Sequence, residues 1–222
     1  HIPAHVIVNP NYGAERLAYS VGRETRVLAG SDYALLRSEF VNVPRPTRSA
    51  SEPRLVVTFG GSDPVNASTR IIKVLSSLQL AFPVRVIVGS GFRGGKELGA
   101  AIESSGLHIE VVRDPSDMAA CLAWGNLAIS AAGGTLWELS YLRLAVAAFS
   151  IVDNQDETAR SLAERSMIFG GQRLSSLGDR ELALVLEEFL FDADRRRACA
   201  DRYHQLIDGR GAERVMAEIL SI

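Results

Sequence analysis

Short runs of consecutive apolar residues alternate with longer amphipathic segments through the middle of the chain. The apolar runs predict strands at 55–59, 84–88, 108–112, 127–129, 146–151 and 167–169. The amphipathic segments predict helices at 66–78, 96–104, 116–123, 135–142 and 156–165. Strands without polar alternation are typical of a parallel sheet that has helices on both faces. The pattern therefore predicts βαβ units and an α/β fold with a doubly wound, Rossmann-like parallel sheet.

The two ends of the chain differ from this middle part. Residues 1–44 predict only a strand at 5–8, a second at 27–30 and a helical turn at 33–40, whereas helices are predicted at 180–191, 194–207 and 212–222. Residues 45–53 are polar and contain Pro46 and Pro53, which is typical of an extended linker. We expect a remnant of an N-terminal domain at 1–44, a linker at 45–53 and a domain with a helical C-terminus at 54–222. Because the chain starts with His1 and enters a strand at once, we also expect further N-terminal sequence upstream.

Composition narrows the possible partners. The 222 residues have a net charge of -2 and are 47% hydrophobic, as in ordinary globular domains. We expect no nucleic-acid partner and no membrane insertion, since no apolar run approaches the roughly 18 residues that span a bilayer. Cys121 and Cys199 are far apart and the histidines are scattered, so neither a disulfide framework nor a metal site is predicted. A reducing, cytoplasmic location is the expectation.

Two glycine-bearing turns follow predicted strands and precede predicted helices. They are Gly60-Gly61-Ser62-Asp63 and Gly133-Gly134-Thr135. Glycine lets the backbone approach a ligand closely, and a helix start presents unpaired N–H groups to an anion. Such turns at the carboxyl ends of strands predict a site for a nucleotide diphosphate. The local alternative for the first turn is a simple helix start, with Asp63 as N-cap and Pro64 as the first helical residue.

Glu138 and the amide pair Asn154-Gln155 each allow a functional and a structural interpretation. Glu138 can accept hydrogen bonds from two ribose hydroxyls, but Thr135 and Glu138 also match a capping box. Asn154 and Gln155 can bind sugar hydroxyls or phosphate oxygens, but Asn154 with Glu157 matches the same box. The residue pattern leaves both alternatives open.

The segment 89–94 matches the dinucleotide-binding pattern G-x-G-x-x-G, with Glu110 about 20 residues later. Glu110, however, falls inside the predicted strand 108–112 and not at its carboxyl end, where a ribose would be held. A glycine-rich flexible loop explains the match equally well. An NAD-binding oxidoreductase therefore remains as an alternative function.

Five segments occur in a recognisable order along the chain. They are Tyr33-Ala34-Leu35-Leu36-Arg37-Ser38-Glu39-Phe40, Gly60-Gly61-Ser62-Asp63, Asp117-Met118, Ala132-Gly133-Gly134-Thr135-Leu136-Trp137-Glu138 and Asn154-Gln155. In this order they resemble the UDP-sugar hydrolases of pseudaminic acid biosynthesis, the PseG family. The similarity extends over about residues 6–165, and its most specific parts are the strings at 33–40 and 133–138.

The resemblance implies a GT-B architecture, with two Rossmann-like domains across a cleft and nucleotide-sugar binding by residues 54–222. It implies that water hydrolyses UDP-2,4-diacetamido-2,4,6-trideoxy-β-L-altropyranose at C1 with inversion, without metal or cofactor. The diphosphate would meet the N–H groups of Ser62 and of Gly134 and Thr135, and the ribose would meet Glu138. The full set of substrate-binding residues implied is Gly60, Gly61, Ser62, Asp63, Met118, Gly133, Gly134, Thr135, Glu138, Asn154 and Gln155.

The chain departs from the family in one respect. The histidine that serves family members as general base lies near the start of their N-terminal domain, and neither His1 nor His5 matches it. We therefore expect the catalytic base upstream of His1, on a missing N-terminal domain. Two further alternatives keep the nucleotide site: a GT-B glycosyltransferase that passes the sugar to a hydroxyl, and a nucleotide-binding partner without catalysis.

Overall fold

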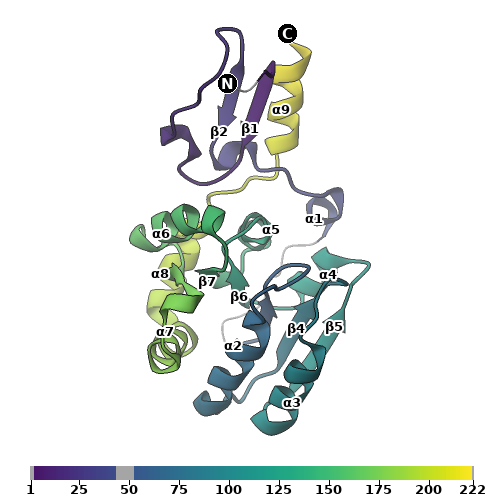
Figure 1. The fold of residues 1–222 in the computed structure, drawn as a ribbon, viewed down its shortest axis with the longest axis vertical. Coiled ribbons are helices and arrows are strands. Elements are labelled where there is room, and N and C mark those ends of the chain that lie inside the picture. Colours follow the sequence, from purple (N-terminus) through teal and green to yellow (C-terminus); the bar gives the residue numbers. More distant parts are fainter. Residues whose placement is uncertain (1–2, 44–52, 222) are drawn as a thin grey trace.

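A six-stranded sheet forms the centre of the larger part of the molecule (Figure 1). The computed structural model describes residues 3–43 and 53–221. The strand order is β5-β4-β3-β6-β7-β8 and every neighbouring pair is parallel. The strands are β3 (Leu55–Thr58), β4 (Val84–Val88), β5 (Ile109–Arg113), β6 (Leu127–Ala131), β7 (Ala145–Ser150) and β8 (Phe169–Arg173). The prediction of a doubly wound, Rossmann-like parallel sheet is confirmed.

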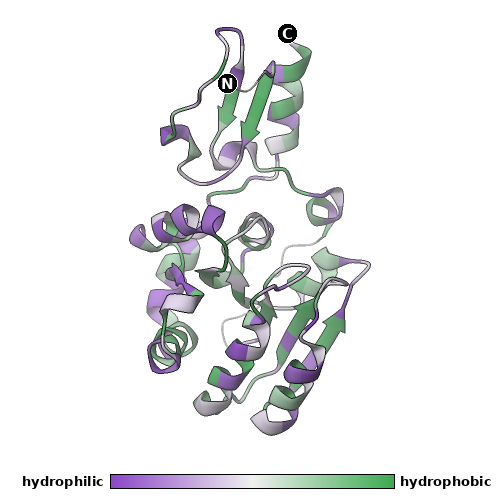
Figure 2. Ribbon diagram, viewed as in Figure 1, coloured by the Kyte–Doolittle hydropathy of each residue, from purple (hydrophilic) through white to green (hydrophobic). Residues whose placement is uncertain are grey.

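Helices cover both faces of this sheet, which explains why its strands are apolar throughout. Leu55 and Val57 of β3 enter one buried cluster, and Val56 between them enters the other. Alternate residues of a strand point to opposite faces, so each strand needs apolar side chains at every position. Figure 2 shows the hydrophobic strands inside and the polar outer surfaces of the helices. The helices are α2 (Ala67–Leu75), α3 (Gly95–Ser105), α4 (Met118–Ala123), α5 (Thr135–Tyr141), α6 (Asp156–Glu164), α7 (Asp179–Phe191) and α8 (Ala193–Tyr203).

A second, smaller unit combines the two ends of the chain (Figure 1). Strands β1 (Val6–Asn9) and β2 (Arg26–Ala29) pair in parallel, and helix α9 (Gly211–Leu220) lies beside them. Arg26 Nη1 lies 2.9 Å from Glu218 Oε2, and Arg214 Nη1 donates to the carbonyl of Asp32 at 3.0 Å. The short elements of this unit and of the link that follows are 3₁₀ turns η1 (Ala14–Arg16) and η2 (Ser31–Tyr33) and helix α1 (Ser38–Asn42).

The predicted division of the chain remains a prediction. Residues 44–52, which include nearly all of the predicted linker at 45–53, lie outside the described residues. Helix α9 belongs to the predicted domain at 54–222, yet it packs against the N-terminal strands, as the contacts of Arg26 and Arg214 show. A division by sequence range alone therefore separates segments that are packed together.

Most elements lie within two residues of their predicted bounds. The helical turn predicted at 33–40 begins only with α1 at Ser38, α8 ends at Tyr203 and not at 207, and β8 also differs. The apolar residues 167–169 predict the strand, but β8 begins only at Phe169 and continues to Arg173. It runs through Gly171, where a side chain would overlap the Cβ atom of Ala163 on α6. The close packing of α6 on β8 thus requires a residue without a side chain, which a search for apolar runs overlooks.

The described residues also contain the 3₁₀ turns η3 (Ser76–Leu78), η4 (Asp153–Gln155) and η5 (Leu174–Ser176). Within residues 3–43 and 53–221, no helix is both long enough and apolar enough to traverse a lipid bilayer.

Candidate functional site

A cavity of about 430 Å³ opens at the carboxyl edge of the sheet. The strand order reverses between β3 and β6, because the chain proceeds from β3 to β4 and β5 on one side and from β6 to β7 and β8 on the other. Open α/β sheets bind ligands at this switch point, outside the carboxyl ends of the strands. The cavity is lined by Arg37, Thr58, Gly60, Gly61, Ile87, Gly89, Asp114, Pro115, Met118, Gly134, Thr135 and Glu138.

Three predicted glycines present open backbone to this cavity. A Cβ atom added to Gly60, Gly61 or Gly134 would meet no other atom within 4 Å. Packing therefore does not explain why these positions lack side chains, although Gly60 also has a φ of +80° that glycine adopts most easily. The open space would let a ligand reach their backbone amides directly.

Two further predicted residues, Thr135 and Met118, also line the cavity. Thr135 is the first residue of α5, and Met118 is the first residue of α4, where Asp117 caps the helix by accepting from Ala120 N at 2.8 Å. The half-buried thioether side chain of Met118 gives one wall of the cavity an apolar, adaptable surface. The cavity thus has a polar side at the glycine turns and an apolar side at α4.

Asp63 and Ser62 lie in a different environment from Gly60 and Gly61. Both line a neighbouring cavity of about 420 Å³, together with Asn66, Gly91 and Arg93 among others. The buried Asp63 carboxylate accepts hydrogen bonds from Ala67 N at 2.7 Å and Ser68 N at 2.8 Å. This favours the helix-start alternative for Asp63. The N-cap interpretation, however, predicts that the helix begins at Pro64, whereas α2 begins at Ala67.

Glu138 does not form the capping box that its spacing from Thr135 suggests. Gly134 is the N-cap residue of α5, and no side chain caps this helix. Instead, Glu138 Oε1 accepts hydrogen bonds from Arg37 Nη2 at 3.0 Å and Nε at 3.3 Å. The capping alternative is wrong here, and the carboxylate is directed at a cation from the N-terminal part of the chain.

Burial shapes the electrostatics of this ion pair. The Glu138 side chain is only 14% exposed, whereas that of Arg37 is 56% exposed. Burial raises the pKa of Glu138 above its ordinary value, and the hydrogen bonds and charge of Arg37 partly oppose this rise. Arg37 also lies 3.0 Å from Glu39 Oε1 and stacks over the Phe40 ring. One guanidinium is thus held at the cavity between two carboxylates and an aromatic ring.

Gly133, Asn154 and Gln155 lie next to the cavity and are not among its lining residues. Gln155 Oε1 accepts from Ile151 N at 3.0 Å, and Gln155 Nε2 would lie 3.2 Å from a Cβ atom placed on Gly133. Asn154 is exposed in η4. The capping box of Asn154 with Glu157 is wrong, because α6 begins at Asp156 and Glu157 accepts from Ser161 Oγ.

The cavity contains two charged residues that the sequence analysis did not identify as site residues. Arg37 belongs to the string at 33–40, on which the family resemblance partly rests. This string could have identified Arg37 as a site residue. Asp114 follows the last residue of β5, so the rule that ligands bind at carboxyl ends of parallel strands could have found it. Thr58, Ile87, Gly89 and Pro115 follow the same rule.

The glycines of the segment 89–94 have a packing explanation. A Cβ atom on Gly89 would lie 2.6 Å from both Cα and O of Gly61, and one on Gly94 would overlap Asn66 Oδ1. Glu110 is the second residue of β5 and therefore lies near the amino end of this strand, not at its carboxyl end. It forms an ion pair with Arg85 at 2.8 Å. These glycines let the loop fit against the turn at Gly61, a reason that does not require NAD.

The described histidines lie elsewhere. His5, His108 and His204 line three other cavities. Within the described ranges, no group of three or more histidine, cysteine and acidic side chains is arranged to hold a metal ion.

Comparison with known proteins adds independent information. No family model matches the chain. It is 28% identical over 152 residues to the uncharacterized protein MJ1062 of Methanocaldococcus jannaschii, covering 64% of this chain and 31% of that protein. It is 24% identical over 217 residues to the spore coat polysaccharide biosynthesis protein SpsG of Bacillus subtilis, covering 95% of this chain and 63% of that protein.

A third relative is named as a transferase. The chain is 30% identical over 216 residues to a UDP-N-acetylglucosamine--N-acetylmuramyl-(pentapeptide) pyrophosphoryl-undecaprenol N-acetylglucosamine transferase of Xylella fastidiosa. The alignment covers 88% of this chain and 58% of that protein. The chain therefore spans between 31% and 63% of the length of these curated relatives.

Solved structures show the same fold. MurG of Acinetobacter baumannii superposes with a TM-score of 0.68 at 18% identity, covering 99% of this chain and 61% of that one. The structure of S. aureus MnaA with UDP gives a TM-score of 0.61 at 12% identity and covers 89% of this chain and 54% of that one. Together, the relatives and structures indicate a GT-B glycosyltransferase-like superfamily, and the sheet matches the C-terminal domain of that fold.

Proposed function

We propose that this chain binds the UDP part of a nucleotide sugar in the 430 Å³ cavity and serves an enzyme that removes the sugar from UDP. The observation that carries this proposal is the set of open glycine backbones facing Glu138 and Arg37 across one cavity at the switch point of the sheet. A neighbouring structure supports it, since S. aureus MnaA was solved together with UDP.

Each part of the cavity suits one part of UDP. The amides at Gly60, Gly61 and Gly134 can donate to the diphosphate without a side chain in the way, and the Arg37 guanidinium supplies a charge of the right sign. Glu138 can accept hydrogen bonds from two ribose hydroxyls through its ionised carboxylate. The proposal places the diphosphate on Gly60 and Gly61 and not on Ser62, which lines the neighbouring cavity.

The amide pair beside the cavity suits the sugar. Gln155 reaches Gly133 with its Nε2 group, and Asn154 is exposed in the same turn. Uncharged amides offer donors and acceptors to sugar hydroxyl or acetamido groups. We assign Gly133, Asn154 and Gln155 to the sugar side of the substrate on this basis.

For the reaction we propose hydrolysis of a UDP-activated amino sugar, with UDP-2,4-diacetamido-2,4,6-trideoxy-β-L-altropyranose as the substrate that the family resemblance implies. Backbone donors at the glycine turns and Arg37 would stabilise the charge that develops on departing UDP. Transfer to a hydroxyl acceptor is the second candidate, and the transferase name of the Xylella fastidiosa relative favours it. Both candidates use the same nucleotide site and differ in the acceptor.

Binding is tested by calorimetric titration of UDP and NAD. A Cβ atom on Gly134 would project into open space, so Gly134→Ala should fold normally and obstruct the ligand. Gly99, in the middle of α3, also has open space around it and provides the matched control, Gly99→Ala. We expect saturable UDP binding that weakens at least about tenfold in Gly134→Ala only. Saturable NAD binding that is lost in Gly91→Val, with no response to UDP, would contradict the proposal.

The acceptor is tested by turnover of the UDP-sugar in water enriched in oxygen-18. Hydrolysis at C1 places the heavy oxygen on the released sugar, whereas cleavage at phosphorus places it on UDP. We expect label on the sugar, with slow turnover by this chain and faster turnover once an N-terminal domain with a histidine base is attached. UDP release that requires an added hydroxyl acceptor would establish the transferase alternative instead.

A further inference from the structure

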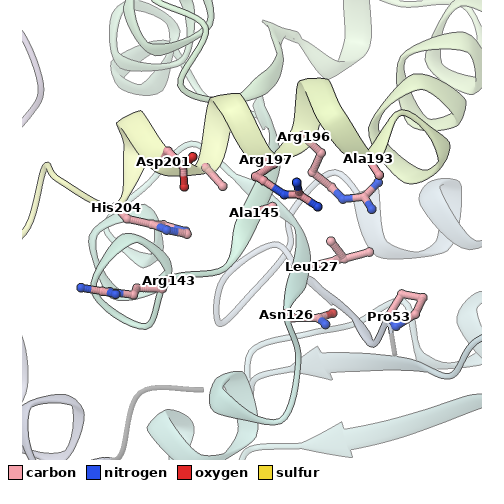
Figure 3. A pocket seen from close by; sticks show the side chains of 11 residues that line it. Pro53, Asn126, Leu127, Arg143, Ala145, Ala193, Arg196, Arg197, Asp201 and His204 are labelled. Atoms are coloured by element: carbon pink, nitrogen blue, oxygen red, sulfur yellow. The ribbon is translucent and has the colours of Figure 1, made fainter. Parts of the chain in front are cut away.

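A second cavity lies at the opposite edge of the sheet, and basic side chains surround it (Figure 3). Its volume is about 210 Å³, and it lies between α8 and the first residues of β6 and β7. Leu127 and Ala145 open these two strands, so the cavity is at their amino ends, away from the nucleotide cavity at the carboxyl ends. Neither the proposed function nor any named relative accounts for it.

Four basic residues and one carboxylate contribute to the lining. Arg196, Arg197 and His204 come from α8 or its C-terminal end, and Arg143 comes from the turn before β7. Asp201 provides the carboxylate. Arg196 is half-buried, and Figure 3 shows Arg196 and Arg197 extending from α8 toward the side of the cavity where Leu127 lies.

The positive charge in this cavity is only partly compensated. Within the described parts of the chain, the side chains of Arg143 and Arg197 form no hydrogen bond or ion pair, and neither of them pairs with Asp201. Arg196 is fixed in place, because its Nη1 group donates to the carbonyls of Phe189 and Leu190 at 2.8 Å each. These are carbonyls at the end of α7, so backbone groups and no carboxylate hold the Arg196 side chain among the described residues.

The electrostatic effects on two neighbouring groups agree with this excess of positive charge. Burial lowers the pKa of Arg196, Asp192 opposes this effect, and the charge of Arg197 adds to it. Burial also lowers the pKa of His204, and the charge of Arg143 lowers it further, against the hydrogen bond to the Leu144 carbonyl and the charge of Asp201. An anion among these groups would relieve repulsion that the protein itself leaves uncompensated.

We propose that this second cavity binds the phosphate group of a small phosphorylated molecule. Guanidinium groups match phosphate oxygens with paired N–H donors, and the side-chain donors of Arg197 are free. Arg143 adds positive charge on the His204 side of the cavity, where Figure 3 shows its side chain extending away from Arg197. Leu127, Ala145 and Ala200 give the cavity an apolar part for a short carbon body, and Asp201 can accept from a hydroxyl on it. A volume near 210 Å³ is below the range of about 300–1,000 Å³ typical of drug-sized ligands, which favours a molecule smaller than a nucleotide.

The test uses the His204 imidazole as a reporter inside the cavity. Its carbon-bound ring proton is followed by NMR while inorganic phosphate is added to the whole chain, and His204→Gln identifies the signal. Bound phosphate should raise the pKa of His204 and move its signal toward the imidazolium position in a saturable way. Because His204 does not line the nucleotide cavity, phosphate bound there leaves this signal in place.

Two variants and two controls make the test specific. Arg143 has a φ of 61°, which asparagine tolerates, so Arg143→Asn combined with Arg197→Gln removes both free guanidiniums without losing a known contact. This double variant should bind phosphate at least about tenfold more weakly. Arg180→Gln removes an exposed arginine outside the cavity, and Gly134→Ala alters the nucleotide cavity; both should bind phosphate at this site as the parent chain does.

Three results would overturn the proposal. The first is a His204 signal that does not respond to phosphate, and the second is an equal response in the double variant and in Arg180→Gln. The third is an equal response to succinate at the same concentration, because a dicarboxylate that binds equally well would remove the assignment to phosphate. If UDP did not bind in the cavity at the carboxyl ends of the strands, the expected His204 signals would be unchanged. The two proposals can therefore be refuted independently.

Discussion

Arg37 and Glu138 are 101 positions apart in the chain, and Arg37 donates both Nε and Nη2 to Oε1 of Glu138. Arg37 precedes α1 in the N-terminal part, whereas Glu138 lies in the first turn of α5 after the second glycine turn. Both line the cavity at the switch point of the sheet. The candidate site is therefore not confined to the Rossmann-like sheet, since one of its charges comes from the segment before residues 44–52.

Glu138→Gln should separate ribose binding from a structural role. The amide keeps the shape and some hydrogen bonding but loses the charge that two hydroxyls would meet. We expect UDP affinity at pH 7 to fall by about 1–3 kcal/mol, measured by calorimetry, without a decrease in the free energy of unfolding. Glu39→Gln removes the other carboxylate beside Arg37 and is the matched control, with a smaller effect on UDP. A loss of stability without a loss of affinity would identify Glu138 as a structural partner of Arg37 only.

UDP binding should depend on pH through Glu138. Burial raises the pKa of Glu138 above its ordinary value of 4.5, so the carboxylate takes up a proton at a higher pH than an exposed glutamate does. We expect UDP affinity to fall as the pH drops from 7 through this raised pKa, and the fall to be absent from Glu138→Gln. Titrations at a series of pH values would measure this, and identical pH profiles for both proteins would contradict it.

The raised pKa of Glu138 should affect stability and UDP binding in opposite directions: as the pH rises, UDP affinity increases but the contribution of Glu138 to the free energy of unfolding decreases. A carboxyl whose pKa is higher in the folded than in the unfolded chain favours folding most below its unfolded pKa. That contribution is lost as the pH rises through the raised, folded-state pKa. Urea unfolding at several pH values should therefore show Glu138→Gln gaining stability relative to the parent chain as the pH rises from 4 to 7. A constant difference between the two proteins over this window would rule out a raised pKa.

Gly89→Ala should destabilise the fold although Gly99→Ala should not. The new Cβ atom at 89 would lie 2.6 Å from the backbone of Gly61, so the turn at Gly61 must move. We expect a cost of about 1–3 kcal/mol in urea unfolding and weaker UDP binding, because overpacked sites shift their backbone. Gly99→Ala meets no neighbour and replaces glycine inside a helix, where alanine is more stable by about 1 kcal/mol. Equal stability of the two variants would show that the loop at 89–94 is not tightly packed.

Arg173 should act on the sugar through the turn that carries Asn154 and Gln155. Its Nη2 group lies 2.5 Å from Asp153 Oδ1 and 2.6 Å from Asp156 Oδ2, at the two sides of η4. Arg173→Met releases both carboxylates, and we expect KM for the UDP-sugar to rise while binding of UDP alone is kept. Lysine at this position should restore only part of the effect, since it cannot form the same paired contacts.

The Arg173 prediction is checked against Gln155→Ala by a double-mutant cycle on KM. If Arg173 acts by positioning Gln155, the effects of the two substitutions should not add. Additive effects, or an equal loss of affinity for UDP without the sugar, would show that Arg173 has a different role.

Local pattern predicted the secondary structure well, and particular elements show why. Strand β4 has the predicted bounds, and β7 lies within one residue of its prediction. These strands contribute side chains to cores on both faces, so burial leaves a continuous apolar signature in sequence. The glycine turns at Gly60 and Gly134 were also predictable from local sequence. Each turn is a short segment between an apolar strand and a helix, and glycine residues stand out in so short a segment.

The roles of the individual side chains were less predictable. Spacing alone suggested a capping box for Glu138 with Thr135, but the carboxylate pairs with Arg37. Spacing allowed Asp63 either to bind a ligand or to cap a helix, and its carboxylate accepts from Ala67 N and Ser68 N. A three-residue separation is compatible with several side-chain directions, and packing against distant segments selects among them.

Local patterns in the sequence were enough to predict the sheet, its helices and the position of the glycine turns, since these depend on burial periodicity and on backbone freedom within a few residues. The three-dimensional fold was needed to show that Arg37 pairs with Glu138, that α9 returns to the N-terminal strands, and that Arg143, Arg197 and His204 line one cavity. These arrangements depend on strand order and on contacts between residues many positions apart. Patterns of apolar and polar residues within a short segment do not show which distant segments that segment contacts.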